Sequence, residues 1–148
     1  MLIANRLIRK RERSAGTLLD TITLDSDSRH VRRARVQSDG GQAVLIDLGE
    51  ASFLQDGDAL AVGDGLIEIR AAAEPLLEIK AQNALALARL AWHLGNRHAP
   101  AELTAEVILI QPDHVLQHLA EGLGASVRPV SRAFQPEAGA YGHGHEHE

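Results

Sequence analysis

Histidines are the residues of this sequence best suited to chemistry, and they gather in a few places. One stretch, residues 91–98, ends a run of helix-forming residues and contains two of them. Another closes the chain, where glycine and glutamate alternate with His143, His145 and His147. A short histidine-rich tract with no core to join is typical of metal binding. Because the chain contains no cysteine, imidazole and carboxylate groups must hold any transition metal.

The first stretch places one histidine beyond a helix. Alanine- and leucine-rich sequence predicts a helix over residues 82–94. Gly95 suits the left-handed position that often ends a helix, and Pro100 prevents the helix from resuming. We therefore expect the helix to stop before Asn96 and His98 to project from the loop that follows.

Other histidines have simpler interpretations. His114 and His118 are four residues apart in a helix expected over residues 113–122, so they share one helix face. That spacing suits two ligands of one metal ion, although exposed histidine pairs on helices are often only solvated. No H-E-x-x-H motif accompanies them, so no general base stands beside the pair. His93 falls on a polar stripe of the preceding helix and reads as a solvated helix residue.

Composition indicates a globular, cytoplasmic protein. Hydrophobic residues make up 45% of the 148 residues and charged residues 24%, as in folded domains. No apolar run approaches the roughly 20 residues that span a bilayer, and residues 1–4 are too short for a signal peptide. Residues 1–35 hold nine Arg and Lys against four Asp and Glu, whereas the remainder holds six against sixteen. The two parts therefore look like different modules.

Several other functions are poorly supported. The sequence has no phosphate-binding loop, no G-x-S-x-G motif and no cysteine nucleophile. Its basic N-terminal part has no aromatic residue before Phe53 on which a base could stack, so a nucleic acid is not an expected partner. A solvated strand face or an acidic protein partner fits this part better.

Alternating apolar and polar positions, with regularly spaced turns, predict a small all-β domain over residues 1–73. The extended segments are expected at residues 2–13, 17–24, 31–36, 43–48, 59–62 and 66–69. Turn signals at residues 39–41, 57–58 and 63–65 separate the later strands. Such short, evenly spaced strands are typical of a sandwich or a barrel.

A different pattern follows residue 73. Pro75 cannot donate a hydrogen bond in a sheet, so the domain boundary is placed there. The expected elements are a strand at 76–81, the helix at 82–94, strands at 103–105 and 107–110, the helix at 113–122 and a strand at 126–132. This β-α-β-β-α-β order predicts a ferredoxin-like domain over residues 74–134, followed by a flexible tail at 135–148. The fold class is therefore α+β.

These motifs, taken in order, resemble the urease accessory nickel chaperone family, UreE. The resemblance rests on HLGNRH at residues 93–98, DHVL at 113–116 and FQPEAGAYGHGH at 134–145, with DSR at 27–29, GD at 57–58 and DG at 64–65 in the N-terminal half. It implies a homodimeric protein that is not an enzyme. Such a protein binds Ni(II) and delivers it to apo-urease in an activation complex with the urease accessory GTPase, UreG.

The resemblance also implies the ligands. The histidine that matches His98 comes from each subunit to the dimer interface, where two-fold symmetry supplies a pair of ligands. The three tail histidines would complete the coordination shell, and His114 is a further candidate. Some members carry another histidine two positions before His114, where this chain has Pro112. His118 could substitute for it.

Two alternative functions are also compatible with the sequence. A metal-dependent hydrolase could use His93, His98 and His114, but it would need a carboxylate or another water-activating group at an open metal position. A protein-binding adaptor would give the histidines no role. For the metal itself, imidazole ligands suit Ni(II), and Cu(II) and Zn(II) are expected to compete.

Overall fold

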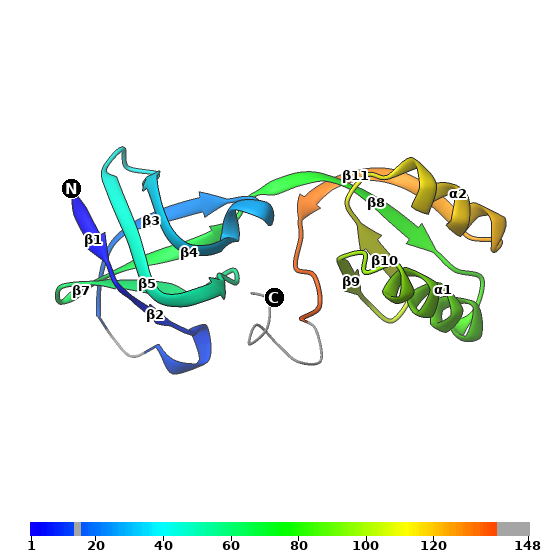
Figure 1. The fold of residues 1–148 in the computed structure, drawn as a ribbon, viewed down its shortest axis with the longest axis horizontal. Coiled ribbons are helices and arrows are strands. Elements are labelled where there is room, and N and C mark those ends of the chain that lie inside the picture. The colour runs from blue at the N-terminus through cyan, green and yellow to red at the C-terminus, as the bar shows by residue number, and fades with distance from the viewer. Residues whose placement is uncertain (14–15, 139–148) are drawn as a thin grey trace. The chain divides into compact units, whose positions relative to one another are not determined.

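The computed structural model describes residues 1–13 and 16–138. The tail histidines therefore lie outside the described residues. The chain divides between Ala72 and Ala73 into two compact units (Figure 1). None of the helices in the described ranges is long and apolar enough to cross a membrane.

Two β-sheets enclose the core of the first unit. The three-stranded sheet has the order β1-β5-β4, from β1 (Leu2–Ala4), β5 (Ala43–Phe53) and β4 (His30–Gln37). The four-stranded sheet has the order β2-β6-β7-β3, from β2 (Arg6–Ile8), β6 (Ala59–Val62), β7 (Gly65–Ala71) and β3 (Thr17–Leu24). Aliphatic side chains from both sheets, including Ile22, Ile46, Leu60 and Ile67, are completely buried in one cluster. The predicted all-β character is confirmed.

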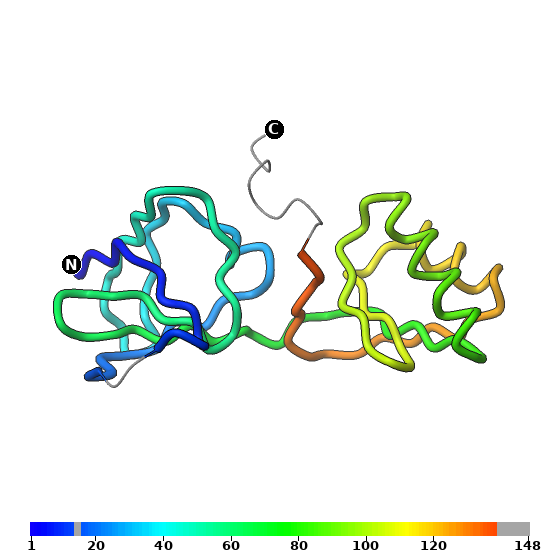
Figure 2. The backbone as a smooth tube through the Cα atoms, turned by 90° about the horizontal axis from the view of Figure 1, so that it is seen from below, coloured from blue at the N-terminus to red at the C-terminus, as the bar shows by residue number. Residues whose placement is uncertain are grey.

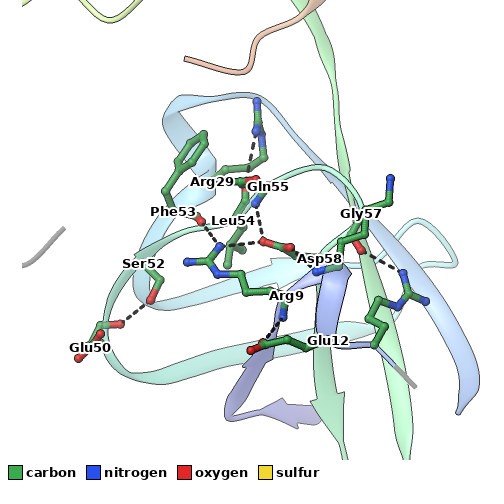
Figure 3. Close-up of polar contacts among 12 residues, drawn as sticks. Arg9, Glu12, Arg29, Glu50, Ser52, Phe53, Leu54, Gln55, Gly57 and Asp58 are labelled. Atoms are coloured by element: carbon green, nitrogen blue, oxygen red, sulfur yellow. Dashed lines mark hydrogen bonds and ion pairs between the residues drawn. The ribbon is translucent and has the colours of Figure 1, made fainter. Parts of the chain in front are cut away.

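A buried carboxylate ties the short 3-10 helix η1 (Lys10–Glu12) to this unit. Asp58 is 2% exposed, and its carboxylate accepts hydrogen bonds from the Arg9 guanidinium at 2.8 Å and from the backbone N–H groups of Lys10 and Gln55 at 2.9 Å (Figure 3). Arg9 also donates to the carbonyl of Phe53 at 2.8 Å. The network therefore joins the N-terminal segment to the end of β5.

The second unit has the predicted ferredoxin-like order. Its elements are β8 (Ala73–Lys80), α1 (Ala84–Asn96), β9 (Ala101–Leu103), β10 (Val107–Ile110), α2 (His114–Gly122) and β11 (Ser126–Ala133). The sheet is antiparallel with the order β11-β8-β10-β9. Because β10 lies between β8 and β9, the first βαβ unit is split, as this fold requires. The α+β class is confirmed.

Both helices pack on the same face of the sheet. The shared cluster consists mainly of Leu77, Ile79, Ile108 and Ile110 from the strands, Leu90 and Leu94 from α1, and Ala120 from α2. Successive strand residues point to opposite faces, so Leu76 and Leu109 lie on the other face. There Phe134, which is 1% exposed, covers them.

Strand β8 begins before Pro75, contrary to the expectation that this proline precedes the strand. Pro75 pairs with Ser131 of β11, but β10 pairs only with the later part of β8, Leu77–Lys80. At Pro75 the strand therefore has a neighbour on one side, and its missing N–H need not remove a ladder hydrogen bond. Strand β9 also begins two residues earlier than predicted.

Candidate metal site

The end of α1 gives His98 an unusual backbone conformation. The Ala99 N–H donates to the Leu94 carbonyl at 3.2 Å, and the His98 N–H donates to the Gly95 carbonyl at 3.0 Å. These two bonds form a Schellman motif, whose first residue beyond the cap is left-handed. His98 occupies that position with a φ of 56°, and no other non-glycine residue in the described ranges has a positive φ.

The prediction that Gly95 ends α1 is therefore wrong. Gly95 lies inside the helix, which continues through Asn96, and it does not have a positive φ. Leu94 is buried against the sheet, and Ala99 packs against the same apolar cluster. This tertiary burial favours a motif that joins Leu94 to Ala99, so the left-handed residue falls three positions after the glycine.

Helix α2 ends in the same motif with a glycine in the equivalent position. The Ala125 N–H donates to the Ala120 carbonyl, and the Gly124 N–H donates to the Glu121 carbonyl, both at 3.0 Å. Gly124 has a φ of 91°. A side chain in the left-handed region costs roughly 1 to 2 kcal/mol. His98 bears a cost of this kind, and residues held in such conformations cluster at functional sites.

The remaining described candidates lie on helix surfaces. His114 is the first residue of α2 and is exposed. The side chain of His118 is 83% exposed, with Nδ1 at 3.9 Å from a Glu121 carboxylate oxygen. His93 is half-buried in the last turn of α1, where its ring meets the edge of Trp92 at 5.0 Å between centroids.

These histidines do not converge within one chain. Across residues 1–13 and 16–138, no group of three or more His, Asp or Glu side chains is placed to hold one metal ion. His93, His98 and His114 therefore do not make a three-ligand cluster in the described part of a single subunit. A site of three or more such ligands that includes His98 therefore needs residues outside the described ranges or from another subunit.

A groove of about 470 Å3 nevertheless brings two of the sequence motifs to one place. Arg97, Ala99 and Pro100 line it from the loop after α1, and Pro112, Asp113 and Val115 line it from the start of α2. His98 and His114 are neighbours in sequence of these lining residues. Val115 is 71% exposed, so this part of the surface is partly apolar.

Residues 135–137, which precede the tail, lie beside the residues that follow the same loop. The Gln135 N–H donates to a Glu102 carboxylate oxygen, and the Glu137 N–H donates to the Ala101 carbonyl, both at 2.8 Å. Ala101 opens β9, three residues after His98. Residues 135–138, predicted to begin a free tail, are thus held against the sheet as far as Glu137.

Sequence reasoning did not identify Glu102 or Phe134 as part of this arrangement. The sequence feature that could have drawn attention to Phe134 is its aromatic side chain, which directly follows a strand in a chain with few aromatic residues. Its partners are distant in sequence, so local periodicity could not reveal them.

Comparison with known proteins identifies the family. The model of the UreE urease accessory protein N-terminal domain matches residues 4–72, and that of the C-terminal domain matches residues 74–148. The urease accessory protein UreE of Azorhizobium caulinodans is 46% identical over 154 residues, which cover 99% of this chain and 74% of that protein.

Two further relatives carry the same name. The protein of Chelativorans sp. is 49% identical, with 86% of this chain and 82% of the relative covered. The protein of Agrobacterium fabrum is 50% identical, with 84% and 81% covered. Since the two family models together span both units, and since the relatives share nearly half of the aligned residues, the chain belongs to the UreE urease accessory protein family.

Proposed function

We propose that this protein is a nickel metallochaperone of urease maturation. A cytoplasmic homodimer binds Ni(II) through His98 of each subunit and through His143, His145 and His147 of the tails. It then delivers the ion to apo-urease in a complex with the accessory GTPase UreG. Its family membership supports a role in urease maturation. The protein acts as a carrier and not as an enzyme.

The observation that carries the proposal is the conformation of His98. Gly124 serves the same backbone position in α2, so a histidine is not required to end a helix. The Schellman bonds and the packing of Ala99 hold the loop, while the His98 side chain remains exposed. An imidazole on a fixed backbone is a preorganised ligand, and imidazole suits nickel.

A second subunit would supply the second imidazole. An isologous interface places the same residue of both subunits near the two-fold axis. The groove beside His98 and the exposed Val115 offer partly apolar surface for such a contact. Residues 1–73 contain none of the candidate ligands, and we assign them to binding partner proteins.

The tail histidines are within reach of this site. His143 follows Glu137 by six positions along the chain, a length of roughly 20 Å when fully extended. Ala101, which binds Glu137, is at most roughly 10 Å of chain from His98. All-nitrogen ligands without a thiolate can be displaced one at a time, which suits transfer of the ion. Cu(II) and Zn(II) compete for the same imidazoles.

His114 and His118 remain candidates for a second, weaker site. They lie one turn apart on the exposed face of α2, and Glu121 is near His118. Two imidazoles of one helix supply too few ligands for tight binding without water or another group. We therefore rank this site below the one at His98.

Titration with Ni(II) tests the central assignment. The wild type should bind one tightly held ion per dimer, and His98→Ala should lower that affinity by at least about tenfold, because both subunits lose a ligand. Truncation after Tyr141 should weaken Ni(II) binding less than His98→Ala does. His93→Ala is the matched control, since it removes an imidazole from the same helix end. Full-affinity binding of one ion per dimer by His98→Ala would show that the assignment is wrong.

Urease activation at limiting Ni(II) separates the proposal from an adaptor role. A variant that combines His98→Ala with tail truncation should no longer increase urease activation at limiting Ni(II). If activation survives that change but is lost when residues 1–70 are deleted, the protein acts as an adaptor.

A further inference from the structure

We propose that residues 134–138, here called the strap, are a positioning element of the metal site, and that Phe134 and Glu102 hold it in place. The strap determines where the tail leaves the folded domain, and so how often the tail imidazoles meet His98. This inference rests on the proposed function, because it concerns the cooperation of the tail with His98.

The strap crosses the helix-free face of the sheet. Phe134 is almost completely buried against Leu76 of β8 and Leu109 of β10, two neighbouring strands. In both views the orange segment after β11 runs on the side of β9 and β10 away from α1 (Figures 1 and 2). The aromatic side chain therefore anchors the chain between the two edges of the sheet.

Glu102 secures the strap at the far edge. Its side chain is 17% exposed, and one carboxylate oxygen accepts the Gln135 N–H at 2.8 Å. The other oxygen lies 3.8 Å from the Arg132 guanidinium. One carboxylate thus contacts the chain on both sides of Phe134. The bond from Glu137 to the Ala101 carbonyl then brings the strap to the beginning of β9.

The crossing changes the point from which the tail departs. Strand β11 is at one edge of the sheet and β9 at the other, three strand spacings away. That separation is roughly 14 Å. Without the strap, the tail would start from the end of β11. With it, the tail starts at the strand that follows the His98 loop.

The expected gain follows from the length of the tether. His143 follows Glu137 by six positions along the chain, whereas it follows Ala133, the end of β11, by ten. Effective concentration falls roughly as the −3/2 power of tether length, so release of the strap lowers it about twofold. The displaced starting point adds to this loss. We expect a total weakening of Ni(II) binding of roughly two- to fivefold.

The experiment is a double-mutant cycle on the full-length protein with Ni(II) as the probe. Glu102→Ala and Phe134→Ala are each measured in the full chain and in a chain truncated after Ala138. Glu106→Ala is the matched control, because it removes an exposed carboxylate from the turn between β9 and β10. Hydrogen exchange of the Gln135 and Glu137 amides reports directly whether the strap has been released.

Glu102→Ala should speed exchange at both amides and weaken binding two- to fivefold in the full chain. It should leave the affinity of the truncated chain unchanged. Glu102→Gln retains a side-chain oxygen that can accept the Gln135 N–H, so it should restore most of the affinity. Glu106→Ala should leave the Ni(II) affinity of both the full and the truncated chain unchanged. If Phe134→Ala does not fold, the Glu102 variants carry the test.

Two results would overturn the inference. Equal weakening in the full and truncated chains would show that the strap acts through the fold and not through the tail. Unchanged affinity of the full chain, despite fast exchange at Gln135 and Glu137, would show that the tail does not need a fixed starting point. The proposed function fails by a separate result, which is wild-type affinity in His98→Ala.

Discussion

His98 and Gly124 show how one backbone position can serve stability or chemistry. Both residues follow a helix in a Schellman motif, and both have a positive φ. Glycine adopts this conformation without steric cost, whereas histidine does not. The chain therefore accepts a less stable ending for α1, where the side chain is a candidate ligand. Natural proteins commonly trade stability for function at such residues.

Substitution at these two positions tests that interpretation. His98→Gly should have a free energy of unfolding about 1 kcal/mol higher than His98→Ala, since only glycine relieves the left-handed conformation. Gly124→Ala should lower the free energy of unfolding by about the same amount. Urea denaturation of the three variants measures both differences. Equal stabilities of His98→Gly and His98→Ala would contradict the assigned strain.

At the scale of elements, buried polar contacts hold segments that have little regular structure. The helix η1 contributes no buried residue, and Asp58 attaches its start to the rest of the unit. The strap depends in the same way on Glu102. In both cases a carboxylate accepts a backbone N–H of a short segment that has no regular ladder to satisfy it.

The contribution of Asp58 to stability can be compared with that of an exposed ion pair that has nearly the same N–O distance. Arg9 and Asp58 are 2.8 Å apart with Asp58 buried, whereas Arg33 and Asp47 are 2.9 Å apart with both side chains exposed. Asp58→Ala removes the acceptor of the partly buried Arg9 guanidinium and of two backbone N–H groups, so it should lower the free energy of unfolding by about 3 kcal/mol.

Asp47→Ala is the control and should cost less than about 1 kcal/mol. Circular dichroism is the appropriate readout, because the single tryptophan, Trp92, is in the other unit. Similar losses for the two variants would show that Asp58 is not the structural centre of its network.

At the scale of the whole molecule, carboxylates of both units make stability depend on pH. The Ser38 hydroxyl lowers the pKa of Asp20, and the Thr21 hydroxyl lowers the pKa of Asp39, each from the usual 3.8. In the second unit, the hydrogen bond from Arg128 lowers the pKa of Glu78 from its usual 4.5. A lowered folded-state pKa stabilises the protein above the unfolded value, and this contribution disappears as the pH falls through the folded value.

Thermal unfolding should therefore change little between pH 7 and about pH 5 and shift to lower temperature below about pH 4. Glu78→Gln removes one of the titrating groups with little change of shape. The drop in melting temperature between pH 5 and pH 3 should be smaller in this variant. An unchanged drop would show that the Glu78–Arg128 pair does not contribute to acid sensitivity.

The sequence alone determined the types and order of most elements. Alternation over residues 17–24 depends on which face each residue turns to the core, and it correctly indicated a strand. The turn signal at residues 39–41 correctly placed the next strand at residues 43–48. The βαββαβ order followed from the helical and extended periodicities after residue 73. The histidine motifs pointed to the family that the comparisons identify.

Only the tertiary structure decided the positions of His98 and of the strap. The packing of Leu94 and Ala99 against one apolar cluster, not the nearest glycine, selects the left-handed residue after α1. Phe134 is held by Leu76 and Leu109, which are far from it in sequence. The periodicity of a sequence shows which nearby residues lie on the same face of a helix or strand. A helix ending and a strap depend on contacts that exist only once the sheet has formed.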